Sequence, residues 1–141
     1  MNPIITPTKN MFYAQRLSQK NMAVYYSRHE LAWDSERFFR NWNELENYEI
    51  LVKNRTVGIL SLSSDDIACY IRDLQVEPGF QGRGIGSITI NYAVSRARTY
   101  GSRLLRLCAF VDNPAVALYE RVGFCIVKAD KNTLYMERNI Y

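Results

Sequence analysis

Hydrophobic and aromatic positions between residues 11 and 42 recur at helical spacing. Asp34 and Ser35, in the middle of this stretch, are residue types that cap helix starts. We therefore expect two helices within residues 11–42. The preceding residues contain Pro3 and Pro7, which favour an arm or a short edge strand.

Three short apolar runs follow, and polar turns separate them. The runs cover residues 48–52, 56–63 and 67–76. Such runs with short turns between them are typical of neighbouring antiparallel strands. The pattern predicts a three-stranded meander.

The pattern then changes to alternating helices and strands. Apolar residues at i, i+3, i+4 and i+7 predict a helix over residues 87–100, with its stripe at Ile90, Ala93, Val94 and Ala97. Residues 103–111 form the next strand, so a strand, a helix and a strand occur in succession. Such a unit makes its two strands parallel, with a right-handed connection.

The last part of the chain predicts a short helix over 115–122 and two strands over 124–129 and 133–140. Together these elements predict an α/β fold. We expect a mixed, mostly antiparallel sheet of six or seven strands, with helices on both faces.

The connection from the third strand to the long helix is rich in glycine. It contains Gln81-Gly82-Arg83-Gly84-Ile85-Gly86, here called the glycine loop. Glycines allow a ligand to approach the backbone, and a helix start offers free N–H groups and a positive dipole to a phosphate. Dinucleotide and P-loop motifs fit this spacing less well. A glycine-rich turn without a ligand is the alternative.

The amino-acid composition is that of a globular protein. With 141 residues, 48% of them hydrophobic and 23% charged, the chain fits one globular domain over residues 1–141. No apolar run is long enough for a membrane span and no signal peptide is visible. Cys69, Cys108 and Cys125 lack metal-ligand spacing, so we expect buried free thiols, no metal and a cytoplasmic location.

The net charge of +4 is distributed unevenly. Between Glu77 and Asp112 there is no acidic residue, and that segment holds five arginines: Arg83, Arg96, Arg98, Arg103 and Arg106. A basic segment beside the glycine loop suits an anionic ligand such as coenzyme A. Solvated arginines are the alternative, which we favour for Arg96 and Arg98 and leave open for Arg83 and Arg106. Because no nucleic-acid motif occurs, we expect no nucleic-acid partner.

A second motif specifies the ligand. Asn113 to Phe124 reads NPAVALYERVGF, about thirty residues beyond the glycine loop. Both segments resemble the GCN5-related N-acetyltransferase family, whose motifs are Gln/Arg-x-x-Gly-x-Gly/Ala and Asn-x-x-Ala-x-x-Leu-Tyr-x-x-x-Gly-Phe. The resemblance covers residues 45–140, while 11–42 match only as the family's variable, substrate-facing part. The family asparagine precedes the tyrosine by seven residues, where this chain has Asp112, so Asp112 or Asn113 fills that position.

The resemblance implies transfer of an acetyl group from acetyl-CoA to a primary amine by direct attack in a ternary complex. It also implies a splayed central pair of parallel strands and a bulge that exposes N–H groups to the thioester. It places acetyl-CoA against Leu74, Gln75, Val76, Gln81, Gly82, Arg83, Gly84, Ile85, Gly86, Ser87, Asn113 and Tyr119.

Tyr119 is the candidate general acid, because the family tyrosine stands near the coenzyme sulfur; its alternative is core packing on a helical stripe. Asp73 is the candidate base or an orienting residue, and its alternative is an ion pair with Arg72 or Arg106. We expect His29, the only histidine, to be structural.

The acceptor is not specified by any motif. Aromatic and acidic residues in the N-terminal part suit a cation, or else belong to the core and the solvated surface. They are Tyr25, Tyr26, Trp33, Trp42, Glu30, Asp34 and Glu36. A small amine and a protein amine both fit. A second hypothesis is a non-catalytic module of the same fold that binds acyl-CoA. A monomer and a homodimer are both compatible with the sequence.

Overall fold

Seven strands form one mixed sheet in the computed structural model, which describes residues 2–141. In chain order they are β1 (Ile4–Pro7), β2 (Glu46–Val52), β3 (Arg55–Ser64), β4 (Ala68–Val76), β5 (Leu104–Phe110), β6 (Cys125–Asp130) and β7 (Thr133–Asn139). The spatial order is β1-β2-β3-β4-β5-β7-β6, and only the β4–β5 pair is parallel. The predicted fold class is confirmed.

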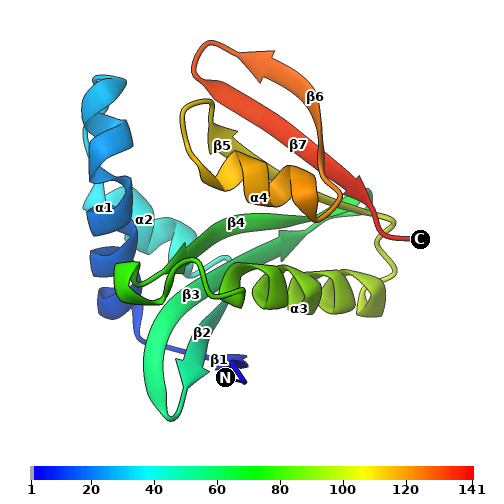
Figure 1. The fold of residues 1–141 in the computed structure, drawn as a ribbon, viewed down its shortest axis with the longest axis horizontal. Coiled ribbons are helices and arrows are strands. Elements are labelled where there is room, and N and C mark those ends of the chain that lie inside the picture. The colour runs from blue at the N-terminus through cyan, green and yellow to red at the C-terminus, as the bar shows by residue number, and fades with distance from the viewer. Residues whose placement is uncertain (1) are drawn as a thin grey trace.

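Four α-helices accompany the sheet (Figure 1): α1 (Met11–Arg28), α2 (Ser35–Trp42), α3 (Ile85–Thr99) and α4 (Ala115–Arg121). A 3₁₀ turn, η1 (Pro78–Phe80), precedes the glycine loop. The Asp34 carboxylate accepts a hydrogen bond from the Arg37 backbone N–H at 3.0 Å and begins α2, as expected of a cap. None of the helices in the described part of the chain is long and apolar enough to cross a membrane.

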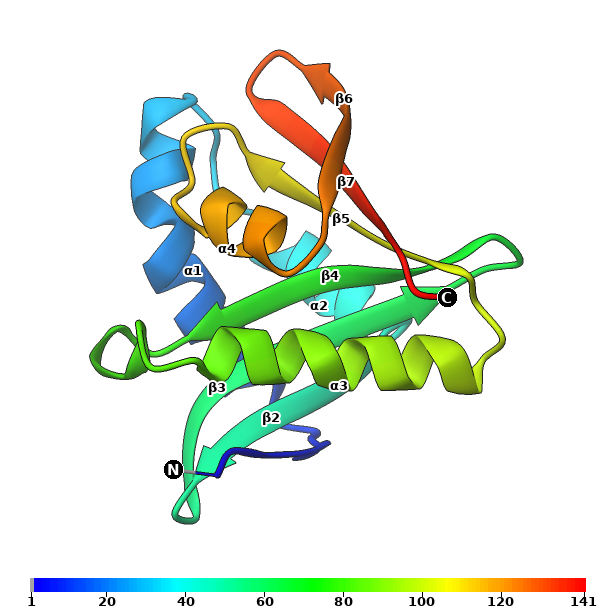
Figure 2. The ribbon, with the colours of Figure 1, turned by 45° about the vertical axis from the view of Figure 1, so that its right-hand side comes forward.

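The helices cover both faces of the sheet. On one face, α3 buries the predicted stripe Ile90, Ala93, Val94 and Ala97 against the central strands, and α4 packs on the same side. On the other face, α1 and α2 place Leu17 and Trp42 against Ile59 of β3. Figure 2 shows α3 in front of the sheet, with α1 and α2 behind it.

The central parallel pair is joined over only part of its length. Ala68–Ile71 of β4 pair with Leu104–Leu107 of β5, although β4 continues to Val76 and β5 to Phe110. The two strands therefore diverge at their C-terminal ends, as the resemblance implied (Figures 1 and 2).

A β-bulge in β4 lies at the point of divergence. Ile71 pairs with Leu62 of β3, but Asp73 pairs with the adjacent Ser61, so Arg72 is an extra residue. Bulges bend a strand and re-aim its side chains. Arg72 and Asp73 consequently stand at the start of the opening between β4 and β5.

Two of the three cysteines contradict the expectation of burial. Cys69 is buried in the core, whereas Cys108 and Cys125 are exposed. Cys108 alternates along β5 with the buried Leu105 and Leu107, and Cys125 begins β6, an edge strand whose residues are all exposed. For Cys125, the apolar run in the sequence did not distinguish a central strand from an edge strand.

Candidate active site

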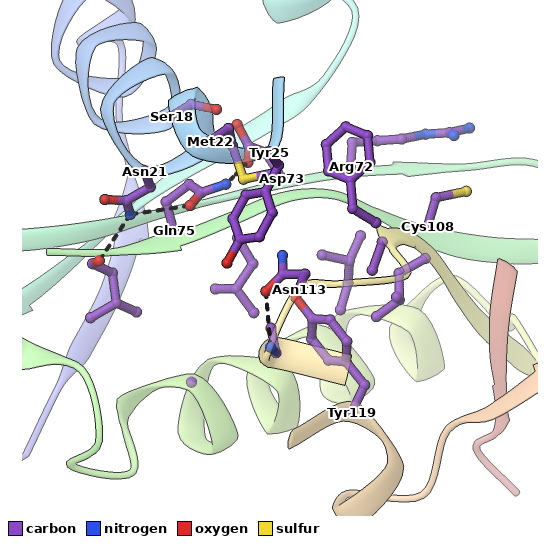
Figure 3. Close-up of a pocket in the computed structure, with 18 of the residues that line it drawn as sticks. Ser18, Asn21, Met22, Tyr25, Arg72, Asp73, Gln75, Cys108, Asn113 and Tyr119 are labelled. Carbon is purple, nitrogen blue, oxygen red and sulfur yellow. Dashed lines mark hydrogen bonds between the residues drawn. The ribbon is translucent and has the colours of Figure 1, made fainter. Parts of the chain in front are cut away.

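A cavity of about 1010 Å³ occupies the opening between β4 and β5. Its walls come from α1, the α1–α2 connection, α2, the C-terminal half of β4, the glycine loop, the end of β5 and α4. Figure 3 shows side chains from these separate elements converging on one space. All of the predicted coenzyme-binding residues line this cavity except Arg83.

The glycine loop forms one end of the cavity. Gly82 and Gly84 have φ angles of +74° and +83°, and a Cβ at either position would meet nothing within 4 Å. These glycines are needed for the backbone conformation and leave open space beside it. Gly84 precedes α3 without any side-chain cap, so the first N–H groups of the helix face a site suited to phosphate.

Gly86 and Arg83 have different surroundings from those expected. A Cβ on Gly86 would lie 2.9 Å from Leu118 Cδ2, so this glycine allows α4 to pack closely against α3. The Arg83 guanidinium lies over the Phe80 ring at 5.1 Å, and that of Arg55 lies at 5.2 Å from the same ring. Both arginines add positive charge beside the loop from outside the cavity lining.

The β4 backbone supplies donors along the middle of the cavity. The Glu77 N–H donates to the Val57 carbonyl of β3 at 2.7 Å. Because backbone groups alternate along a strand, the N–H groups of Leu74 and Val76 point away from β3, toward the side from which β5 has diverged. The Val76 carbonyl accepts hydrogen bonds from the side-chain amides of Asn21 at 3.1 Å and Gln81 at 3.0 Å. These bonds attach α1 and the glycine loop to β4.

Tyr119 both packs and faces the cavity. Its side chain is 8% exposed and its ring meets Phe124 edge-on at 6.0 Å, while it extends from α4 toward Asn113 in Figure 3. Burial, with a smaller contribution from the charge of Asp73, raises the pKa of Tyr119 to about 12. The phenol therefore stays protonated at neutral pH and is a hydrogen-bond donor there.

Asp73 is a carboxylate without a salt bridge in the described structure. Its Oδ1 accepts a hydrogen bond from Gln75 Nε2 at 2.9 Å. Burial raises the pKa of Asp73, and hydrogen bonds from the Gln75 and Ser18 side chains and from the Leu74 backbone N–H partly oppose the rise. The charge of Asp73 also raises the pKa of Tyr119, which places the two groups within electrostatic reach of each other.

The two arginines considered as partners of Asp73 bind elsewhere. Arg72 Nε donates to Ser63 Oγ at 2.8 Å, and Arg106 Nε donates to Glu137 Oε1 at 2.7 Å. The described structure therefore does not contain the ion pair considered for Asp73, and no arginine neutralises the charge of this carboxylate.

The positions of Asp112 and Asn113 differ clearly. Asn113 lines the cavity, and its Oδ1 accepts a hydrogen bond from the Ala115 N–H at 2.9 Å. Asp112 lies outside the lining and binds Arg28 Nη1 at 3.2 Å and His29 Nε2 at 2.8 Å. His29 thus has a structural role, because it connects the end of α1 to the β5–α4 loop. Of the two candidates for the position of the family asparagine, the geometry favours Asn113, which lines the cavity.

The end of the cavity opposite the glycine loop is lined by part of the predicted acceptor set. Tyr25, Tyr26, Trp33 and Asp34 line it. Trp42 is only 8% exposed and belongs to the core, as the alternative interpretation stated. Glu30 and Glu36 lie outside the lining.

Several lining residues were missed by the sequence analysis. They are Ser18, Asn21 and Met22 of α1, Arg37 and Phe38 of α2, Cys108 and Phe110 of β5, and Arg121 of α4. Ser18, Asn21, Met22 and Tyr25 have the i, i+3, i+4, i+7 spacing of one helix face. This face mixes polar and apolar residues, so a search for hydrophobic periodicity did not detect it. Within residues 2–141, no cluster of three histidine, cysteine or carboxylate side chains could hold a metal ion.

The sequence profile of the family described as acetyltransferase (GNAT) family matches residues 14–124. The chain therefore belongs to the GNAT acetyltransferase family. The match begins well before residue 45, so it includes most of the helical N-terminal part.

Two curated relatives show the extent of the similarity. The chain is 28% identical over 117 residues to the [ribosomal protein bS18]-alanine N-acetyltransferase of Salmonella typhimurium, covering 80% of this chain and 73% of that protein. It is 38% identical over 71 residues to an uncharacterized N-acetyltransferase of Methanocaldococcus jannaschii, covering 50% of this chain and 31% of that protein. The chain thus matches about a third of the latter relative's length.

Solved structures share the fold over nearly the whole chain. The PaiA N-acetyltransferase of Thermoplasma acidophilum, in complex with coenzyme A, has a TM-score of 0.79 and 14% identity over 99% of each chain. A GNAT family acetyltransferase from Elizabethkingia anophelis with acetyl-CoA bound has a TM-score of 0.78 and 16% identity over 98% of each chain. At these identities the comparison concerns the fold.

Proposed function

We propose that this chain is an acetyl-CoA-dependent N-acetyltransferase that acts on a primary amine. The observation that carries the proposal is the cavity at the divergence of β4 and β5. It joins an uncapped helix start, strand N–H groups and the Tyr119 hydroxyl in one continuous space. The same cavity continues past Asp73 to the α1–α2 connection, which leaves room for an acceptor and supports an enzyme over a binding module.

The residues of the cavity fit an acyl-CoA in its separate parts. The N–H groups at the start of α3 suit the pyrophosphate, and the N–H groups of Leu74 and Val76 suit the pantetheine arm and the thioester carbonyl. Acetyl-CoA supplies the thioester, whose carbonyl carbon is open to attack by an amine. Donors held in place around its oxygen stabilise the charge that develops there and are each worth a few kcal/mol.

Asp73 and Tyr119 would manage the proton and the leaving thiolate. Asp73, with its raised pKa, would hold the incoming ammonium and accept one proton, leaving a neutral nitrogen. The nitrogen lone pair forms the new C–N bond as the C–S bond breaks, and the electron pair of that bond goes to sulfur.

The Tyr119 pKa of about 12 lies well above a thiol pKa near 8.5, which makes complete proton transfer from Tyr119 unfavourable. We therefore assign to Tyr119 a hydrogen bond to the thiolate. Two protons leave the nitrogen in all: one protonates sulfur, directly or through Asp73, and the other passes to solvent.

The test is amine-dependent release of free thiol from acetyl-CoA by the purified chain, with a panel of amino acids, peptides, monoamines and polyamines. We expect thiol release that depends on the amine, and an acetylated amine in equal amount. A binding module would bind acetyl-CoA without amine-dependent turnover. The cytoplasmic location, the absence of a nucleic-acid partner, and a monomeric or homodimeric state stay predictions.

A further inference from the structure

The carboxylate of Asp73 is held by a chain of side-chain amides that begins on α1. Gln75 Nε2 donates to Asp73 Oδ1 at 2.9 Å, and Asn21 Nδ2 donates to Gln75 Oε1 at 3.2 Å. Asn21 Nδ2 also donates to the Val76 carbonyl at 3.1 Å. Figure 3 shows Asn21, Gln75 and Asp73 joined in this order by dashed lines. The amide chain therefore links a backbone carbonyl of β4 to the candidate proton acceptor.

The β4 bulge places Asp73 and Gln75 on the strand face that meets α1. Before the bulge, Ile71 packs in the core with residues of α3, and after it Leu74 packs against the same core. The extra residue moves the alternation of side chains by one position, so Asp73 and Gln75 take the opposite face. Without the bulge, Asp73 would share the face of Ile71 and would not meet α1.

The orientation of the two amides follows from the carbonyl at the start of the chain. A carbonyl oxygen only accepts hydrogen bonds, so the Val76 carbonyl requires the NH₂ group of Asn21. The same NH₂ group lies at Gln75, which must then present its own oxygen to it. The NH₂ group of Gln75 is left to face Asp73. In the opposite orientation the Gln75 oxygen would face a carboxylate oxygen, and both atoms are acceptors.

The Gln75 donor counteracts the effect of burial on Asp73. Burial favours the protonated acid, whereas a hydrogen bond given to the carboxylate favours the ionised form. Only ionised Asp73 can take a proton from an ammonium. The bond to Oδ1 also limits rotation of the carboxylate, and lone pairs remain for a ligand because a carboxylate has about four acceptor positions.

Other ionisable groups surround Asp73 without binding to it. Burial raises the pKa values of Tyr26 of α1 and Tyr119 of α4, and the charge of Asp73 adds to both rises. Further groups face the cavity or a neighbouring hollow of about 430 Å³ from α1, α2, the connections of α2, β4 and β5: Tyr25, Asp34, Arg37, Glu44, Arg72 and Cys108. Within residues 2–141, none of these groups forms a hydrogen bond or salt bridge with Asp73. Direct control of Asp73 therefore falls to its hydrogen-bond donors, Gln75 among them.

We propose that Asn21 and Gln75 are positioning residues for the reaction: Asn21 fixes the orientation of the Gln75 amide, and Gln75 holds Asp73 ionised and aligned to take the proton of the acceptor ammonium. In that step an N–H bond of the ammonium breaks and an O–H bond forms on Asp73. The inference rests on the proposed N-acetyltransferase function and deepens it. It gives the Gln75 side chain a role on the α1 side, apart from the coenzyme contact expected for this residue.

Titration of Asp73 tests the amide chain directly and needs no acceptor. The carbon-13 chemical shift of its carboxyl group is followed by NMR between about pH 4 and pH 9 in the unaltered chain and in Gln75→Met, whose side chain keeps its length without the N–H donor. We expect the Asp73 pKa to rise in the variant by about one to two units, the scale of a hydrogen bond to a charged group. Gln19→Met, at an exposed glutamine of α1 outside the cavity lining, is the matched control. An unchanged Asp73 pKa in Gln75→Met overturns the proposal.

The pH profile of turnover tests the role of Gln75 in the reaction. The measured quantity is kcat/KM with the amine of the panel above that gives the fastest thiol release. We expect Gln75→Met to move the acidic limb to higher pH by the amount that it moves the Asp73 pKa, and to leave the KM for acetyl-CoA unchanged. The ionisation of the amine is common to all variants, so a difference between them belongs to the protein. A loss of activity that is equal at every pH is the result of a merely structural role and overturns the proposal.

A double-variant cycle tests whether Asn21 acts through Gln75. Asn21→Leu leaves the Gln75 amide free to turn, so we expect a smaller displacement of the acidic limb in the same direction. Combining it with Gln75→Met should give no displacement beyond that of Gln75→Met alone. Asn91→Leu, at an exposed asparagine of α3 outside the cavity lining, is the control. A double variant that shows the sum of the two displacements contradicts the role assigned to Asn21.

The same measurements separate failure of this inference from failure of the proposed function. If the unaltered chain releases no thiol with any amine of the panel, the proposed function fails and this inference fails with it. If turnover is present and Gln75→Met raises the Asp73 pKa without moving the acidic limb, Asp73 is not the proton acceptor. The inference is then wrong, while the acetyltransferase function stands.

Discussion

At the residue scale, the site depends on two ionisable groups that one cavity brings together. Burial raises the pKa of both Tyr119 and Asp73 and so favours the protonated form of each. The phenol is kept as a donor, and the carboxylate becomes a better proton acceptor than an exposed aspartate. The sequence proposed both residues as candidates, but whether Asp73 was paired with an arginine depended on a strand register that no local pattern encodes.

Removing the Tyr119 hydroxyl tests its role. Tyr119→Phe keeps the packing against Phe124 and should leave acetyl-CoA affinity and melting temperature nearly unchanged. We expect kcat to fall by about a hundredfold, the scale of a positioned proton or hydrogen-bond donor. Steady-state thiol release measures kcat, and Tyr135→Phe on β7, outside the cavity lining, is the control. A kcat within twofold of that of the unaltered protein would mean that Tyr119 contributes packing and that its hydroxyl has no role in the reaction.

The pH dependence of stability tests the burial of Asp73. Its folded-state pKa is raised, so ionisation at neutral pH costs folding free energy, and that cost disappears as the pH falls below the unfolded value near 3.9. Asp73→Asn should therefore raise the melting temperature at pH 7, and the gain should vanish toward pH 4. Turnover should fall at the same time.

Thermal unfolding between pH 4 and pH 8 gives the comparison. Asp130→Asn, at an exposed aspartate of β6, should show no such pH-dependent gain. A gain for Asp73→Asn that is the same at every pH would mean that ionisation of Asp73 is not the cause.

At the element scale, the strand that carries the site is held by a close backbone approach. A Cβ on Gly58 of β3 would lie 2.5 Å from the Gln75 carbonyl oxygen of β4 and 2.9 Å from Ile50 Cδ1. The first contact is with backbone and cannot be relieved by a rotamer change. Gly58 therefore sets the position of the segment whose N–H groups face the cavity.

Gly58→Ala should lower the free energy of unfolding by about 1–3 kcal/mol, the cost of overpacking a core, and should weaken acetyl-CoA binding because β4 must shift. Chemical denaturation and titration calorimetry measure the two effects. Gly79→Ala is the matched control, since a Cβ there meets nothing within 4 Å. Unchanged stability and affinity in Gly58→Ala would show that β4 tolerates displacement.

The sequence predicted the helices and strands better than the contacts between them. Hydrophobic periodicity located the helices and most strands, and two motifs located the glycine loop and α4. The extra residue at Arg72, the Asp112–His29 contact and the packing of Gly86 against Leu118 were not predicted. Each depends on residues that are distant in sequence, so local spacing carries no signal for it. The exposure of Cys108 was missed for the same reason.

At the scale of the whole molecule, the cavity exists because parts far apart in the chain are joined around it. Asn21 attaches the middle of α1 to β4, and Asp112 attaches the β5–α4 loop to His29 at the C-terminal end of α1. A ligand in the opening contacts all of these parts at once. Its binding should therefore stabilise the fold as a unit.

The most direct test of the account is thermal unfolding with and without acetyl-CoA. At a hundredfold excess over Kd, binding to the folded state adds about 2.7 kcal/mol, which raises Tm by on the order of 10 °C for a chain of this size. Gly84→Val should lose most of this rise, because its side chain would enter the space beside the α3 N–H groups, whereas Gly79→Val should keep it. No rise at millimolar acetyl-CoA, or a full rise in Gly84→Val, would contradict the placement of the coenzyme on the glycine loop.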